Sequence, residues 1–289
     1  MRLGRTIAAT LTLGLAACGG GQPTEEPVPA ETLLGYSLPA LNPLTYSAAD
    51  TARVDIELQP GMPLEQTMGQ SSRVRLSFAP TMGTAGNLTV TAQFIEFGAF
   101  MESSMTGRED VGADAVQGEF TLSVTPEGVV EEVAGPDLPP EVQQMMMGQN
   151  MFADFFVRLP NRVVTPGETW TDTVSTTNDM DGATSTTTMI TVSTLRGDTT
   201  VAGRRLWIID RSRSSHALVE GNVQGMDMRN EMSGTVSETT LWDPARRLLV
   251  SSRGTGEMTG SVSMPAAGMN DMPLRVSNTR TIRLIEGDS

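Results

Sequence analysis

The fold is decided by a stretch of strict alternation, Arg73-Val74-Arg75-Leu76-Ser77-Phe78. Successive side chains of an extended strand point to opposite faces, so Val74, Leu76 and Phe78 share an apolar face while the others face water. Similar alternation recurs within residues 54–59, 88–94, 188–193 and 281–284. One wet face is typical of an antiparallel sheet, because a parallel sheet is usually covered on both faces. The sequence therefore predicts a mainly β protein built on a long, curved antiparallel sheet.

Two Pro-containing turns punctuate the predicted strands. Thr125-Pro126-Glu127-Gly128 and Asp243-Pro244-Ala245-Arg246-Arg247 each lie between apolar runs, as hairpin turns do. The stretches around them, residues 120–130 and 239–249, resemble each other as strand, turn and strand. This likeness is explained either by two duplicated halves or by chance, since Thr-rich strands resemble one another.

One segment carries a helical pattern instead. Asp137 is suited to cap a helix, and the prolines that follow suit a first turn, where no backbone donor is needed. Apolar residues then recur at spacings of three, four or seven, and Pro160 ends the run. The sequence thus predicts one central Met/Phe-rich helix over residues 138–160. It is expected to lie on the concave face of the sheet and to join two halves, residues 45–137 and 161–289.

The amino-terminal sequence indicates export. Arg2 and Arg5 precede an apolar run over residues 7–15, and small residues then lead to Cys18, the only cysteine of the chain. A basic segment, a short apolar segment and small residues before a cut site make up a secretory signal, here residues 1–17. The apolar run is too short to cross a bilayer as a stable helix.

The run Leu15-Ala16-Ala17-Cys18 resembles the lipobox of bacterial lipoproteins. The resemblance implies that Cys18 carries a diacylglyceryl thioether and an acylated amino group, which anchor the protein in a membrane. Gly19 stands at the sorting position, where the lack of an aspartate implies the outer membrane, on its periplasmic or its surface side. The alternative is an ordinary signal peptide beside a lone buried cysteine. Residues 18–44 are expected to form a flexible acidic Gly/Pro tether before a single β-rich domain, residues 45–289.

The charge of the chain limits its partners. Twenty basic residues against 34 acidic ones give a net charge of −14, which is repelled by phosphate backbones. We therefore expect no nucleic-acid partner, and we expect membrane contact to rest on the acyl chains. No glycine-rich motif matches a phosphate-binding loop, so no cofactor is implied.

The chain offers few groups for catalysis. His216 is the only histidine, and because it follows Ser215 directly on a strand, the two side chains point to opposite faces. No Gly-x-Ser-x-Gly motif is present, and no thiol remains once Cys18 is acylated. Zinc ligands do not cluster, and Asn178 to Gly182 lacks the full ligand series of a calcium loop, which favours a hairpin tip. We expect no catalytic residue, no metal site and no enzyme.

The remaining candidate site is apolar and lies on the predicted helix. Methionine and phenylalanine side chains there make a soft surface that adapts to ligands of varied shape. Either the inner side of the helix lines a cavity for acyl chains, or the helix plugs the sheet as part of the core. The candidate ligand-lining residues are Met145, Met146, Phe152, Phe155 and Phe156.

The segment Pro166-Gly167-Glu168-Thr169-Trp170, together with the lipobox and the Met/Phe segment, resembles an uncharacterised family of bacterial envelope lipoproteins. The predicted architecture is similar to the half-barrel of LolA, LolB and LppX proteins, in which a curved sheet wraps an apolar cavity and carries lipids or lipoproteins. The resemblance covers residues 51–286 and implies an outer-membrane lipoprotein that binds or shelters a lipid or other apolar ligand. The alternative is a non-catalytic structural or assembly module that docks an envelope protein through its Thr-rich sheet.

Overall fold

Strands account for most of the described chain, as the sequence predicts. The structure is a computed structural model that describes residues 32–59, 62–139, 142, 152–180, 182–223 and 226–285. The long strands are β2 (Leu44–Gln59), β3 (Met62–Pro80), β4 (Leu88–Ser103), β9 (Thr169–Met180), β10 (Ala183–Val201), β11 (Arg204–Val223), β12 (Met226–Asp243), β13 (Leu248–Met264) and β14 (Met269–Ile285). The short elements are β1 (Thr32–Leu34), β5 (Gly107–Val111), β6 (Glu119–Val124), β7 (Val130–Ala134), β8 (Arg162–Val164) and the 3-10 turns η1 (Ala113–Ala115), η2 (Ala153–Phe155) and η3 (Pro265–Ala267).

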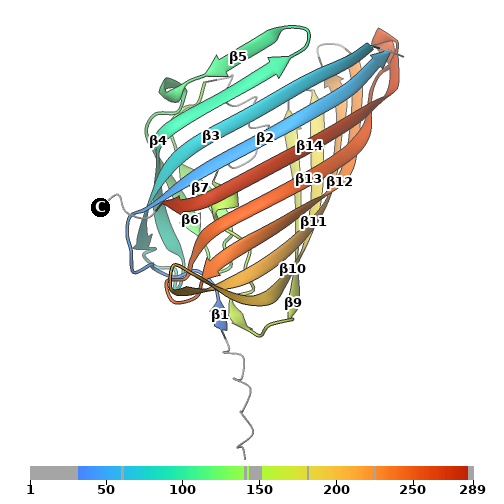
Figure 1. The fold of residues 1–289 in the computed structure, drawn as a ribbon. Coiled ribbons are helices and arrows are strands. Elements are labelled where there is room, and N and C mark those ends of the chain that lie inside the picture. Colours follow the sequence, from blue (N-terminus) through green and yellow to red (C-terminus); the bar gives the residue numbers. More distant parts are fainter. Residues whose placement is uncertain are drawn as a thin grey trace, which may run out of the picture. The chain divides into compact units, whose positions relative to one another are not determined.

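Twelve of these strands form one large antiparallel sheet, which confirms the predicted sheet type. Their order is β7-β6-β4-β3-β2-β14-β13-β12-β11-β10-β9, with β5 paired to β4, while β1 and β8 form a separate pair. The chain winds through the sheet in two meanders, β2 to β7 and β9 to β14, which meet where β2 pairs with β14. Figure 1 shows the long strands curving around a concave inner side, and the described strands do not close into a barrel.

The strand register gives the sheet two ends. The β3–β4, β6–β7, β10–β11 and β12–β13 turns gather at one end, where β2 also begins; we call this the basal end. The opposite, distal end holds the β2–β3, β4–β5 and β13–β14 turns. The segment after β1 also joins the body at the basal end, where the amide of Tyr36 donates to the carbonyl oxygen of Pro126 (2.8 Å).

Both predicted Pro-containing turns are present, and both lie at the basal end. In the β6–β7 turn the amide of Gly128 donates to the carbonyl oxygen of Thr125 (2.9 Å), and its positive φ of 79° suits a residue without a β-carbon. In the β12–β13 turn the carboxylate of Asp243 accepts from the amides of Ala245 and Arg246, each at 3.0 Å. Such short-range side-chain acceptors favour a turn over a continued strand.

The predicted central helix is wrong: the described residues contain no α-helical element, and Val142 alone among them is α-helical. Residues 153–155 form only the 3-10 turn η2, and Phe156 already has extended backbone angles (φ −122°, ψ 98°). The physical reason is burial on every side, since Phe155, Phe156 and Val157 are consecutive and all buried. A helix lying on a sheet buries one stripe of side chains, not three in succession. Residues 140–141 and 143–151 of the predicted helix lie outside the described residues.

The hydrophobic core lies toward the basal end, between the inner face of the sheet and a short segment that crosses it. This segment, residues 152–159, is here called the plug. The ring of Phe152 meets that of Phe120 on β6 edge to face, with 4.9 Å between centroids. Leu34 and Tyr36 also lie buried in this core, so the predicted tether of residues 18–44 is wrong at these two positions. The core is therefore built by the sheet and two crossing segments of the same chain.

Candidate functional site

Inward-pointing side chains of the sheet form rows that run across the strands. One polar row crosses six neighbouring strands through the consecutive cross-strand partners Arg211, Glu238, Gly254, Arg280, Asp50 and Gln70. We call this row the charge belt. It divides the inner face into a basal half, where the plug packs, and a distal half beyond it.

Glu238 is the most buried acid of the charge belt. Its carboxylate accepts hydrogen bonds from Nη1 of Arg211 (2.8 Å) and from the hydroxyls of Thr240 (3.2 Å) and Ser252. Arg213, one row toward the distal end, lies 4.0 Å from its second oxygen. Because only 11% of the Glu238 side chain is exposed, these partners rather than bulk water compensate its charge.

Arg280 connects the charge belt to the plug. Its Nε donates to Asp50 on the neighbouring strand at 3.1 Å, and its Nη1 donates to Asp154 in η2. Burial raises the pKa of Asp50 above its ordinary value, and although Arg280 opposes this rise, the carboxylate of Asp154 adds to it. The plug is thus held on the inner face by an ion pair as well as by aromatic packing.

The pKa values of Glu238 and Arg213 are shifted by the same two causes, burial and the charges of neighbouring side chains. Burial alone would raise the pKa of Glu238, but Arg211, Ser252 and Arg213 bring it below the ordinary value. Burial lowers the pKa of Arg213, and the neighbouring charge of Arg211 lowers it further. Arg213 keeps 24% of its side chain exposed, so it is a cation that would gain from one more anion nearby.

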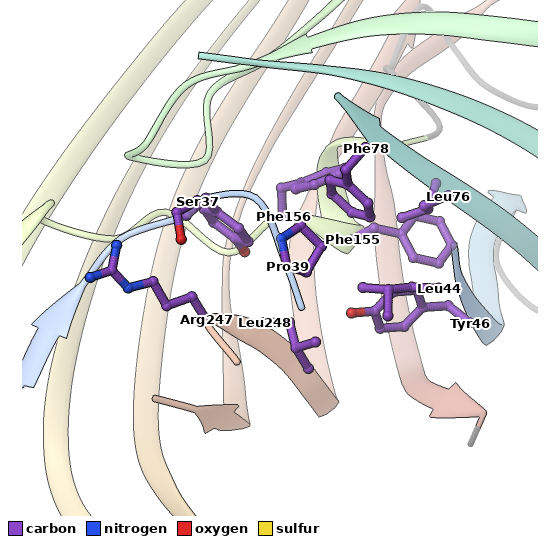
Figure 2. Close-up of a pocket in the computed structure, with 11 residues that line it drawn as sticks. Ser37, Pro39, Leu44, Tyr46, Leu76, Phe78, Phe155, Phe156, Arg247 and Leu248 are labelled. Atoms are coloured by element: carbon purple, nitrogen blue, oxygen red, sulfur yellow. The ribbon is translucent and has the colours of Figure 1, made fainter. Parts of the chain in front are cut away.

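The three predicted phenylalanines lie in the plug, and all are buried. Phe152 packs on Phe94 and Phe120, with ring centroids 5.4 and 4.9 Å away. Phe155 and Phe156 line a small cavity at the base of the inner face (Figure 2). Its volume is about 10 Å³, close to the space that one water needs. Beside these two phenylalanines, the cavity has no room for an alkyl chain.

Beyond Arg213, the distal half of the inner face between β10 and β2 has two rows of uncharged, mostly small or flexible side chains. One row there is Met189, Ser215, Gly234, Met258, Val276 and Val54, and the next is Thr187, Ala217, Met232, Gly260, Leu274 and Ile56. Gly260 has no room for a side chain, because a β-carbon there would collide with the backbone carbonyl oxygen of Glu231 on the neighbouring strand. Met232 and Met258 are half-buried beside these glycines.

The outer face of the sheet holds a wider groove over β10 to β13. Its volume is about 600 Å³. The lining is mainly hydroxyl and charged groups of the outward-pointing residues Val192, Thr194, Arg196, Asp210, Ser212, Ser237, Thr239, Arg253 and Thr255. Asp210 accepts a hydrogen bond from Thr239 (2.9 Å) and pairs with Arg196 (3.2 Å). The Thr-rich sheet that the sequence indicated thus presents a polar groove.

The remaining residues singled out from the sequence are dispersed. Cys18, Met145 and Met146 lie outside the described residues. His216 is half exposed on the outer face, where its Nε2 lies 3.2 Å from Oε1 of Glu231, while Ser215 is on the inner face. Across the part of the chain that the structure describes, no three acidic, histidine or cysteine side chains come together as a metal site. The same residues contain no helix that is long and apolar enough to cross a membrane.

Sequence reasoning missed the charge belt, although its signal was present in the alternation. Arg211 is two residues from Ile209 and therefore points to the same face as that buried side chain. Glu238 stands in the same relation to the buried Thr240. A charge on the apolar face of a strand is costly unless it is paired, so each of these residues predicts a buried partner. Only the strand register identifies which partner.

A comparison with known protein families found no match to this chain, and a search of curated proteins found none either. The class of protein is therefore defined by the fold and the inner face alone. It is an open antiparallel sheet whose inner face is plugged by its own chain in the basal half and crossed by a buried charge belt.

Proposed function

We propose that the chain is an outer-membrane-anchored lipoprotein, without catalytic activity, that shelters a lipid or other apolar ligand on the distal half of its inner face. The observation that carries this proposal is the pair of uncharged rows lined by methionine, glycine and other small residues. An alkyl chain buried on such a surface gains about 0.8 kcal/mol per CH₂ group. Methionine adjusts to its shape because the side chain is unbranched and flexible.

The position of Arg213 suggests that the ligand carries an anionic head group at one end. It borders the distal half, it is partly exposed, and it would gain from another anion. A carboxylate or phosphate head group beside Arg213 would leave the alkyl chain on the uncharged rows toward the distal end. The expected ligand is therefore amphipathic and anionic, as fatty acids and phospholipids are.

Binding of a fluorescent fatty-acid analogue tests this proposal. Met258→Gln introduces a polar amide on the inner face and should weaken binding by about tenfold, since each 1.4 kcal/mol of lost affinity is a factor of ten. Thr259→Gln is the matched control, because Thr259 is exposed on the opposite face of the same strand. Equal affinities for the two variants, or no uptake of the analogue by the wild type, would refute sheltering on the inner face.

The outer-face groove supports a second function, the docking of an envelope protein. Its hydroxyl lining and its two arginines, Arg196 and Arg253, suit an extended segment that carries carboxylates. A volume of about 600 Å³ is far larger than the 10 Å³ cavity beside the plug. In this function the plug serves only to stabilise the sheet, and the partner binds on the outside.

Photo-crosslinking in intact cells tests the docking function. A photoreactive residue at Thr255 should give one discrete adduct that Arg253→Glu removes, because the reversed charge repels an acidic segment. The same photoreactive residue at Ser71, which is exposed away from the groove, is the control and should give no such adduct. An adduct that persists in Arg253→Glu, or that forms equally from Ser71, would contradict docking in the groove.

A further inference from the structure

Exposed apolar side chains gather at the basal end of the sheet. Six of them stand on its loops, turns and strand ends: Leu38, Leu41, Met82, Val129, Val163 and Val201. We call this set the basal rim. At the distal end, the one large apolar side chain exposed among the described residues is Met105. Single exposed apolar side chains are normal on a protein surface, so the feature that carries the argument is the difference between the two ends of the sheet.

The leucines of the basal rim are held in place rather than left on a loose loop. Leu38 and Leu41 are 49% and 50% exposed in the segment that leads into β2. Next to them, the side-chain amide of Asn42 donates to the carbonyl oxygen of Phe78 (2.7 Å) and accepts from its backbone amide (2.9 Å). This two-bond clamp fixes the segment to β3, so that both leucines are presented to the outside.

The net charge of −14 is only partly offset by ion pairs at the basal end. Two acids there pair with arginines: Asp243 binds Arg246 (2.6 Å), and Glu168 binds Arg162. Glu127 in the β6–β7 turn accepts instead from the neutral side-chain amide of Asn161 (2.9 Å) and keeps its charge. Arg247 stands in the β12–β13 turn, where its φ is positive (53°). The apolar side chains of the basal rim, and not a positive charge, are therefore what a bilayer surface would bind.

We propose that the basal rim rests on the surface of a phospholipid bilayer and inserts its apolar side chains among the head groups. The inference rests on the acyl anchor expected at Cys18. Only 13 residues separate Cys18 from β1, and a flexible chain of that length spans about 20 Å on average. β3 alone, with 19 residues, is about 60 Å long. An anchor so close to β1 favours contact by the basal end, since β1 joins the body there.

Two exposed methionines make a matched pair for the test. Met82 (96% exposed) lies in the turn before β4, and Met105 (72% exposed) lies in the turn after it, so the two mark opposite ends of one strand. Cys18 is the only cysteine of the sequence, and acylation converts its thiol to a thioether. Met82→Cys and Met105→Cys each then provide a single reactive thiol in the full-length acylated protein.

Each variant is labelled with nitrobenzoxadiazole and reconstituted on vesicles of phosphatidylethanolamine and phosphatidylglycerol that contain a spin-labelled lipid quencher. The label at position 82 should be quenched at least threefold more than the label at position 105. Flotation of the vesicles separates the two hypotheses. Protein that floats with equal quenching at both positions overturns the basal rim alone. Protein that does not float has no anchor, and this result overturns the proposed membrane attachment and the rim with it.

Discussion

The two halves of the inner face are built by the same strands and differ in what fills them. β13 contributes Leu249 to the basal half, where it is buried in the core, and Met258 and Gly260 to the distal half. Among the described residues, the plug packs on the basal half, and the distal half beyond Arg213 presents the two uncharged rows. The comparison teaches that one continuous sheet acquires two kinds of surface through the size and charge of the side chains along the same strands.

The charge belt marks the border between these two halves. Buried ions lose their hydration, so they are tolerated only where partners surround them. Glu238 has such partners in Arg211, Thr240 and Ser252, and Arg280 reaches Asp154 of the plug. The belt therefore fixes the position of η2 on the inner face, because Arg280 binds Asp154 of the plug.

Truncating one side chain in each half of the inner face should give the largest difference in the free energy of unfolding. Phe152→Ala removes a fully buried ring from its contacts with Phe94 and Phe120 and should lower the free energy of unfolding by about 3–5 kcal/mol. Met258→Ala in the distal half should cost only about 1 kcal/mol, because Met258 is half-buried. Urea denaturation of both variants measures the difference. Equal losses would show that the two halves are packed alike.

Removing the charge of Glu238 in the charge belt should have the next largest effect on the free energy of unfolding. Glu238→Gln keeps the shape of the side chain but leaves Arg211 buried without its counter-charge, which should cost about 3 kcal/mol. Asp50→Asn is the matched change at a more exposed position of the belt. Because burial disfavours the ionised form of Asp50, this variant should lose little stability at neutral pH or gain some. Thermal unfolding of the two variants compares them. A greater loss in Asp50→Asn would contradict the assignment of Glu238 as the buried centre of the belt.

The smallest effect is expected in the pH dependence of stability. The carboxyl groups of Glu238 and Asp50 should change the free energy of unfolding in opposite directions as the pH falls. The pKa of Glu238 is lowered in the folded state, so its contribution to stability is present above about pH 4.5 and lost as the pH falls through that lowered pKa. The pKa of Asp50 is raised in the folded state. Its ionised form therefore costs stability at neutral pH, and the cost is relieved as the pH falls through the raised pKa, above 3.8.

Urea denaturation from pH 7 to pH 3 separates the two carboxyls. The stability difference between wild type and Glu238→Gln should shrink as the solution is acidified below pH 4.5. Relative to Asp50→Asn, the wild type should instead gain stability on acidification. Parallel curves for wild type and both variants would show that neither carboxyl has a shifted pKa in the folded protein.

Much of the sheet could be predicted from the sequence because alternation reports directly on burial. Val74 and Leu76, chosen from their spacing alone, lie buried on the inner face, and the turns at residues 125–128 and 243–247 are where they were expected. These are local properties: a strand's two faces and a turn's φ angles depend on neighbours within a few residues. The order of the strands is different, since the pairing of β2 with β14 has no local signal.

The plug and the charge belt show where local reasoning fails. The spacing of Phe152, Phe156 and Leu159 fits a helix, but these residues are buried because the curved sheet surrounds them, and any conformation there would bury them. The belt depends on register, which places Arg280 opposite Asp50 from a position about 230 residues away. Its members could be suspected singly from their place on an apolar face, whereas their pairing could not.

The pairing of β2 with β14 also sets the order of events when the chain is made. Thr45 pairs with Ile285, so the strand that is synthesised first must wait for about 240 further residues before its partner exists. At about 5–20 residues per second, this wait lasts roughly 10–50 s. Throughout that time one edge of β2 has free backbone donors and acceptors, which other chains can pair with. Completion of the sheet is therefore a late, post-synthetic event, and a chain that loses its last strand keeps an open seam at the centre of its fold.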